Sequence, residues 1–83
     1  MRIIAYTTRG CGHCTTLKKL FNRAGVEYTY HEIGTDIPTH TFMQQFPKCS
    51  GYPWVIIDGE EVGGLVETAK LFLEKGLVDP PKR

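Results

Sequence analysis

The first 33 residues alternate two β-rich stretches with one amphipathic stretch. The run "RIIAYT" at 2–7 is short and apolar, which predicts a strand covered on both faces. Apolar residues then recur at helical spacing from 17 to 24, and Gly25 stands where a C-terminal cap belongs. The stretch "VEYTYHEI" at 26–33 alternates with a period of two, which predicts a second strand. Two strands joined by a helix form a right-handed crossover, so we expect them to be parallel neighbours.

The second half of the chain predicts a short helix, a hairpin and a closing helix. The short helix is expected over 37–46, with Asp36 as its N-cap. Apolar strands flank Asp58-Gly59, a dipeptide favoured in two-residue hairpin turns. The stretch "LVETAKLFLEKG" predicts the last helix, and the proline-rich end at 78–83 is expected to be frayed. The order β-α-β-α-β-β-α indicates an α/β fold with a four-stranded mixed sheet flanked by helices.

Length and charge restrict the classes of function. Residues 1–83 are enough for one small domain and too few for a second core. The net charge is +1, so no basic surplus favours nucleic acid or a membrane surface as a partner. The apolar run at the N-terminus is too short for a secretory signal, and no run of the sequence approaches the roughly 18 apolar residues of a membrane span. We therefore expect a soluble, monomeric, cytoplasmic protein.

Two cysteines, Cys11 and Cys14, stand where the first strand should give way to a helix. Their spacing puts both sulfurs on one face of that helix. Unpaired backbone N–H groups and the positive end of the helix dipole stabilise a thiolate at Cys11, which makes it the expected nucleophile. Cys14, one turn inside the helix, is the expected resolving thiol. His13 and Arg9 can add positive charge beside the pair and so tune its ionisation.

Metal binding and an inert pair are the alternatives to redox chemistry. A Cys-x-x-Cys is also a zinc half-site, and Cys49 with one of the three histidines, His13, His31 or His40, could complete four ligands. Zinc ribbons usually supply a second pair at short spacing, whereas Cys49 follows Cys14 by 35 residues. The pattern therefore favours a reactive dithiol.

Two downstream features are candidates for ligand contact. Pro53 stands at the start of a buried strand, where a missing N–H is tolerated. Gly63 and Gly64 stand between the last strand and the last helix. They either serve the turn alone, or let a ligand approach the backbone while the helix N-terminus binds its carboxylate.

Taken together, these features resemble the glutaredoxins of the thioredoxin-like superfamily, over essentially the whole chain. The resemblance is carried by the Cys-x-x-Cys after the first strand, the Tyr-Pro before the third and the Gly-Gly after the fourth. It implies a thioredoxin-like fold with Cys11 and Cys14 as the active-site couple. It also implies a cis bond at Tyr52-Pro53, where the Tyr52 backbone pairs with substrate.

The resemblance further implies that glutathione is the reductant. Glutathione would lie along the Tyr52-Pro53 loop and reach the start of the last helix, at Gly64, Leu65 and Val66. The substrates would be disulfides of proteins or small molecules, and no cofactor would be bound. The alternatives are a thioredoxin-like protein disulfide reductase recharged by a flavoprotein reductase, and a zinc or iron–sulfur module.

Several positions depart from the glutaredoxin pattern. Residues 11–14 read Cys-Gly-His-Cys, as in protein disulfide isomerases, rather than Cys-Pro-Tyr-Cys. Thr8 stands where a lysine is common, with Arg9 beside it. Val66 replaces an aspartate that receives the ammonium group of glutathione, a role that Glu67 could fill.

Overall fold

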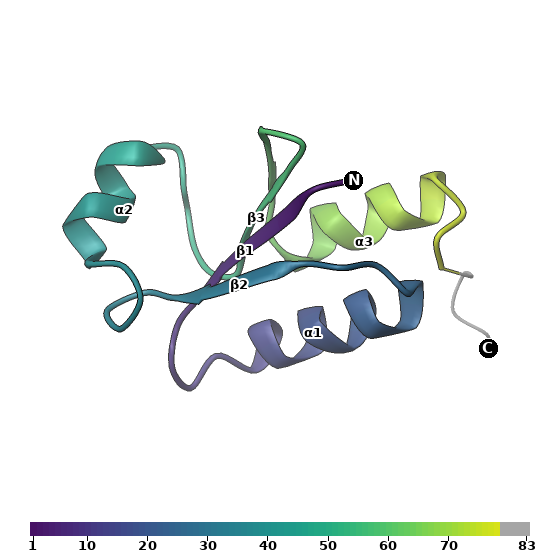
Figure 1. Ribbon diagram of the computed structural model, residues 1–83, viewed down its shortest axis with the longest axis horizontal. Coiled ribbons are helices and arrows are strands. Elements are labelled where there is room, and N and C mark those ends of the chain that lie inside the picture. The colour runs from purple at the N-terminus through teal and green to yellow at the C-terminus, as the bar shows by residue number, and fades with distance from the viewer. Residues whose placement is uncertain (79–83) are drawn as a thin grey trace.

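The computed structural model describes residues 1–78. Along the chain lie β1 (Ile3–Thr7), α1 (Gly12–Ala24), β2 (Thr29–Glu32), α2 (Thr39–Gln45), β3 (Trp54–Ile57), β4 (Glu60–Gly63) and α3 (Leu65–Glu74) (Figure 1). This is the order that the sequence predicted. The fraying predicted for the proline-rich end at 78–83 lies, from residue 79 on, outside the described part. No helix within residues 1–78 has the length and apolar character to cross a membrane.

The four strands form one mixed sheet in the order β2-β1-β3-β4. β1 runs parallel to β2 and antiparallel to β3, and β4 returns antiparallel to β3. β1 is therefore a central strand, and the helix that follows it crosses back to the parallel neighbour as expected. β2 is shorter than the strand predicted at 26–33, because only Ile4 to Thr7 of β1 pair with it.

Alternate residues of the central strands face two separate cores. On one face, Ile3 and Val55 pack with Leu17, Phe21 and Phe72 from α1 and α3. On the other face, Trp54 and Ile56 of β3 pack with Phe42 of α2. Figure 1 shows α2 well apart from α1 and α3. Because successive side chains of a strand point to opposite faces, α1 and α3 cover one face of the sheet and α2 covers the other.

The second face is covered less completely than the sequence predicted. Ile4 and Tyr6 of β1 are half-buried, whereas Ile3, Ala5 and Thr7 on the other face are buried. The reason is that α2 is only seven residues long. A hollow lined in part by Ile4 remains beside the hairpin.

The predicted turns occur where expected. Gly25 ends α1 with φ +68°, in the left-handed conformation. Asp58 and Gly59 have φ angles of 51° and 84°, so both central positions of the hairpin turn are left-handed.

The predicted start of the second helix was wrong. α2 has Pro38 as its N-cap, and Asp36 lies outside it. Pro38 disfavours helical backbone in the residue before it, so the helix cannot begin earlier. Asp36 instead closes the loop after β2, where its Oδ2 accepts the backbone N–H of Glu32 at 2.8 Å.

Phe42 should be the main anchor of α2. Its ring is fully buried, with its centroid 4.9 Å from that of Tyr6 and 5.7 Å from that of Tyr52. We expect Phe42→Ala to lower the free energy of unfolding by about 3–5 kcal/mol in urea denaturation. Met43→Ala is the matched control, because its side chain is 41% exposed on the same helix; it should cost less than about 1 kcal/mol. Similar losses in the two variants would contradict this account of α2.

Candidate active site

Cys11 is the N-cap of α1, directly after the turn that follows β1. Its backbone is extended, and its Sγ accepts the backbone N–H of Cys14 at 3.2 Å. The side chain is half-buried, and the first turn of α1 contains no acidic residue. The N-cap sulfur therefore lies at the positive end of the helix dipole, beside the free backbone N–H groups of the first turn. The strand-to-helix placement predicted for Cys11 is therefore present.

Cys14 occupies the opposite environment, one turn inside α1. Its side chain is only 2% exposed. Burial, and next the hydrogen bond with Cys11, raise the pKa of the Cys14 thiol to about 12. Cys14 therefore keeps its proton at neutral pH and is shielded from solvent, while Cys11 beside it is accessible.

The Tyr52-Pro53 segment, directly before β3, approaches Cys11. The peptide bond between these residues is cis, as the resemblance implied. The Cys11 thiol donates a long hydrogen bond to the backbone oxygen of Tyr52, with 3.9 Å between Sγ and O. The ring of Tyr52 packs against Phe42, so α2 supports this segment from behind.

A hollow of about 370 Å³ adjoins this segment and includes Tyr52, Pro53, Gly64 and Glu67 in its lining. Gly64 is the N-cap of α3. Leu65 and Val66 begin α3, and Val66 is 60% exposed. The predicted glutathione-contact residues thus lie at or next to one hollow.

Glu67 caps this end of α3, a function that the sequence prediction missed. Its Oε1 accepts the backbone N–H of Gly64 at 2.8 Å. The signal was present in the sequence, because a glutamate three residues after an N-cap is the second half of a capping box.

A second hollow, also about 370 Å³, lies beside Cys11 itself. Its lining includes Thr15 of α1, and Tyr30 and Glu32 of β2. The ammonium group of Lys18 lies 3.8 Å from the centroid of the Tyr30 ring. Sequence reasoning considered His31 of β2 as a possible metal ligand but did not place Tyr30 or Glu32 beside Cys11. Only the parallel pairing of β1 and β2 brings them there.

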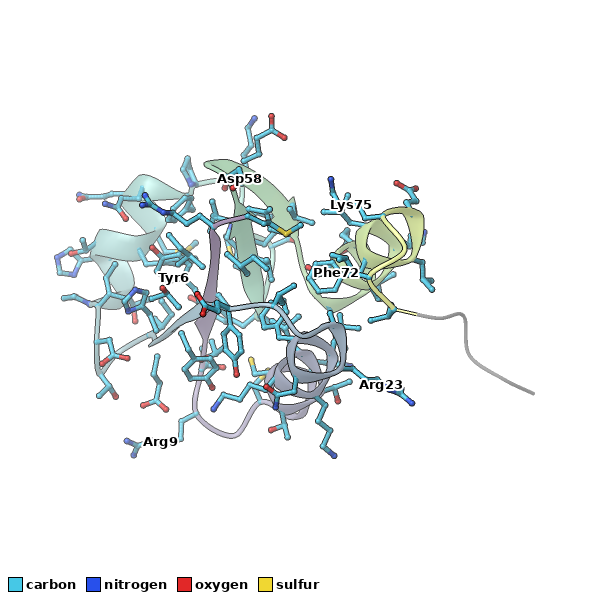
Figure 2. All side chains as sticks on the ribbon, turned by 45° about the vertical axis from the view of Figure 1, so that its right-hand side comes forward. Tyr6, Arg9, Arg23, Asp58, Phe72 and Lys75 are labelled. Carbon is cyan, nitrogen blue, oxygen red and sulfur yellow. The ribbon has the colours of Figure 1, made fainter. Side chains whose placement is uncertain are left out.

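Arg9 and His13 lie at the surface near the dithiol. The side chain of Arg9 is 87% exposed, and its Nη2 lies 3.7 Å from Oε2 of Glu32. Figure 2 shows Arg9 projecting away from the rest of the protein. His13 is exposed in the first turn of α1. Their influence on Cys11 stays a prediction.

The residues that could have formed a metal site do not lie close together. Cys49 packs near the α2 core, where its thiol donates to the backbone oxygen of Gly51 at 3.2 Å. Within residues 1–78, no three His, Cys, Asp or Glu side chains are grouped closely enough to hold a metal ion. The proposed ligands Cys49, His13, His31 and His40 therefore do not form a site with the pair.

The family model for glutaredoxin matches residues 3–62 of the chain. The chain belongs to the glutaredoxin family. Human mitochondrial glutaredoxin-2 is 27% identical over 79 residues, which is 92% of this chain and 48% of the human protein. The gene 56 protein of Mycobacterium phage D29 is 30% identical over 56 residues, or 68% of this chain and 62% of the phage protein. The chain thus spans about half of the length of the human protein and about three-fifths of the phage protein.

A solved structure of buckwheat glutaredoxin in complex with glutathione superimposes with a TM-score of 0.73. The two chains are 22% identical, and the match covers 90% of this chain and 71% of the buckwheat chain. The chain therefore has the thioredoxin-like fold.

The raised pKa of Cys14 predicts selective alkylation. With a pKa of about 12, the thiolate fraction of Cys14 at pH 7 is on the order of one part in 10⁵. We expect iodoacetamide to modify Cys11 far faster than Cys14 in the folded, reduced protein, as mapped by mass spectrometry. Because the thiolate of Cys14 appears only as the pH approaches 12, the difference should persist at pH 9. In urea the two cysteines should react at similar rates. Equal rates in the folded protein would disprove the assigned environments.

Proposed function

We propose that this glutaredoxin is a glutathione-linked thiol–disulfide oxidoreductase that reduces disulfides and mixed disulfides through Cys11 and Cys14. The observation that supports it most is the asymmetry of the pair. Cys11 Sγ lies accessible at the N-terminus of α1 and accepts a backbone N–H, while Cys14 is buried and holds its proton. Membership of the glutaredoxin family agrees with this chemistry.

In the first step, the Cys11 thiolate attacks one sulfur of a substrate disulfide. The substrate S–S bond breaks, a Cys11–substrate disulfide forms, and the departing sulfur takes up a proton. Cys14 then gives up its proton and attacks Cys11 Sγ. This releases the second substrate thiol and leaves a Cys11–Cys14 disulfide, so two electrons have passed to the substrate.

Two glutathione molecules return the pair to the reduced state. The thiolate of the first attacks Cys11 Sγ, because Cys14 is only 2% exposed. Cys14 is released as a thiol, and Cys11 carries glutathione. The second glutathione attacks the bound glutathione sulfur, so glutathione disulfide leaves and Cys11 is free again.

The hollow beside Tyr52 is the proposed place for glutathione. Its cysteinyl backbone would pair with Tyr52, next to Cys11, and its glutamyl end would reach Gly64, Leu65 and Val66 at the start of α3. Arg9 and His13 would favour the Cys11 thiolate through their positive charge. We further propose that the protein acts as a monomer in the cytoplasm, where glutathione is kept reduced.

The two cysteines should differ in how much activity their loss removes. We expect Cys11→Ser to abolish reduction of every disulfide, whereas Cys14→Ser should still reduce a glutathionylated peptide. In that variant Cys11 takes the glutathione from the peptide, and a free glutathione then attacks the Cys11–glutathione disulfide without a resolving thiol. Turnover is followed with glutathione and its reductase, and Cys49→Ser is the matched control with full activity.

Equal loss in the two active-site variants on the glutathionylated peptide would contradict the assigned roles. The same assay run with thioredoxin reductase as the donor decides between the glutathione-linked reaction and a thioredoxin-like one.

Val66→Asp should improve the use of glutathione. An aspartate at this 60% exposed position would give the glutathione ammonium a charged partner, and such a hydrogen bond is worth roughly 1.5–3 kcal/mol. We expect kcat/KM for glutathione to rise on the order of tenfold or more. Met43→Asp introduces the same charge on α2 and should have no effect. An unchanged kcat/KM in Val66→Asp would show that the ammonium does not lie near residue 66.

A further inference from the structure

Lys18 stands one turn after Cys14 on α1, so the two side chains share a face of the helix. Lys18 is half-buried, whereas the next residue, Lys19, is exposed. The Lys18 ammonium group lies 3.8 Å from the centroid of the Tyr30 ring, which is within the range of a cation–π interaction. Tyr30 in turn pairs with Ala5 of the central strand. A long and normally mobile cation is therefore held against β2, on the face of α1 that carries Cys14.

The resolving step requires Cys14 to ionise in surroundings that disfavour charge. Its side chain is 2% exposed, and burial, and next the hydrogen bond with Cys11, raise the pKa of its thiol to about 12. Two neighbours act in the opposite direction. The backbone of Thr8 favours the thiolate through a hydrogen bond, and the positive charge of Lys18 favours it more weakly.

The balance changes once Cys11 is joined to a substrate. In the reduced protein, the negative charge of a Cys11 thiolate opposes a second negative charge on Cys14. A Cys11 sulfur bound in a disulfide carries no charge, so this repulsion is lost while the effect of Lys18 remains. Lys18 is then the charged side chain that acts on Cys14 at the moment when Cys14 must attack.

The other ionisable side chains at this end of the sheet do not take the place of Lys18. In the part of the chain that the structure describes, the charges that shift the pKa of Cys14 are those of Cys11 and Lys18. The remaining groups of the neighbouring segments are the paired Arg9 and Glu32, the exposed His13, Tyr6 of β1, Tyr30 and His31 of β2, and Glu67, Lys70 and Glu74 of α3.

We propose that Lys18 stabilises the Cys14 thiolate in the resolving step, with Tyr30 as the positioning residue that holds its ammonium group. The inference deepens the proposed function and rests on it, because it takes Cys14 to attack the Cys11–substrate disulfide. In that step the Cys14 proton passes to solvent and a Cys14–Cys11 bond forms. The Cys11–substrate bond breaks, and the substrate sulfur leaves with the electron pair and takes up a proton.

Single-turnover reaction with dipyridyl disulfide separates the two steps, because this uncharged reagent releases one absorbing thiopyridone in each. The first release follows attack by Cys11, and its rate rises with the concentration of the reagent. The second follows attack by Cys14 on the mixed disulfide, and its rate does not depend on that concentration. Stopped-flow absorbance measures both. All proteins carry Cys49→Ser, so that Cys11 and Cys14 are the only thiols.

We expect Lys18→Met to slow the second release about threefold at neutral pH, and the first release by less than about twofold. The lost charge leaves less thiolate at Cys14, which the greater nucleophilicity of that thiolate offsets only in part. Lys18→Arg keeps the charge and should restore most of the rate, and Lys19→Met is the matched control. Tyr30→Leu should slow the second release in the same way, and Tyr30→Phe, which keeps the ring, should restore most of it.

Alkylation of Cys14 distinguishes a lost charge from a loosened helix. In a Cys11→Ser background, the reaction of Cys14 with iodoacetamide is followed by mass spectrometry over a range of pH. Adding Lys18→Met should slow this reaction about threefold and shift its pH profile upwards, because less thiolate is present at each pH. A merely structural disturbance would expose Cys14 and accelerate its alkylation instead. Lys19→Met is again the control.

An unchanged second release in Lys18→Met, equal slowing of the two releases, or faster alkylation of Cys14 overturns the inference. An unchanged second release in Tyr30→Leu overturns the role given to the ring. If the protein with an unaltered Lys18 shows a first release but no second one, Cys14 does not resolve the mixed disulfide. The proposed function then fails together with the inference, whereas a second release that ignores Lys18 leaves the proposed function standing.

Discussion

Leu17 and Phe21 of α1 pack against Ile3 and Ala5 of the central strand, and the position of the dithiol depends on this contact. It holds α1 along the sheet, so the helix begins close to the end of β1. Cys11 then falls at the N-cap, where its sulfur completes the first turn of the helix. Since buried aromatic and aliphatic contacts of this kind are worth several kcal/mol each, the reactive sulfur rests on one of the more rigid parts of the molecule.

The site draws on both faces of the sheet. Cys14 is buried on the α1 side, and this burial separates its behaviour from that of Cys11. Tyr52 comes from the opposite face, where Phe42 supports its ring, and its backbone oxygen reaches Cys11. Damage to either core should therefore be felt at the dithiol, although neither Phe21 nor Phe42 could take part in the chemistry.

Local patterns were read correctly where a single residue type controls the backbone. Gly25 ends α1, and Asp58-Gly59 forms the hairpin turn, because both need left-handed conformations that few other residues adopt. The reading failed where two local signals competed. Asp36 was predicted to cap α2, but Pro38 prevents the helix from starting there, and Asp36 bonds to Glu32 instead.

The sequence alone was sufficient to predict the α/β order, the mixed sheet and the pair Cys11 and Cys14, because hydrophobic period, turn residues and spacing are properties of short stretches. The tertiary structure alone decided what surrounds the pair. It brought Tyr30 and Glu32 beside Cys11 through strand pairing, buried Cys14 enough to raise its pKa to about 12, and put Glu67 across Gly64. Burial, and contacts between segments distant in the sequence, depend on how the elements pack, which no short stretch specifies.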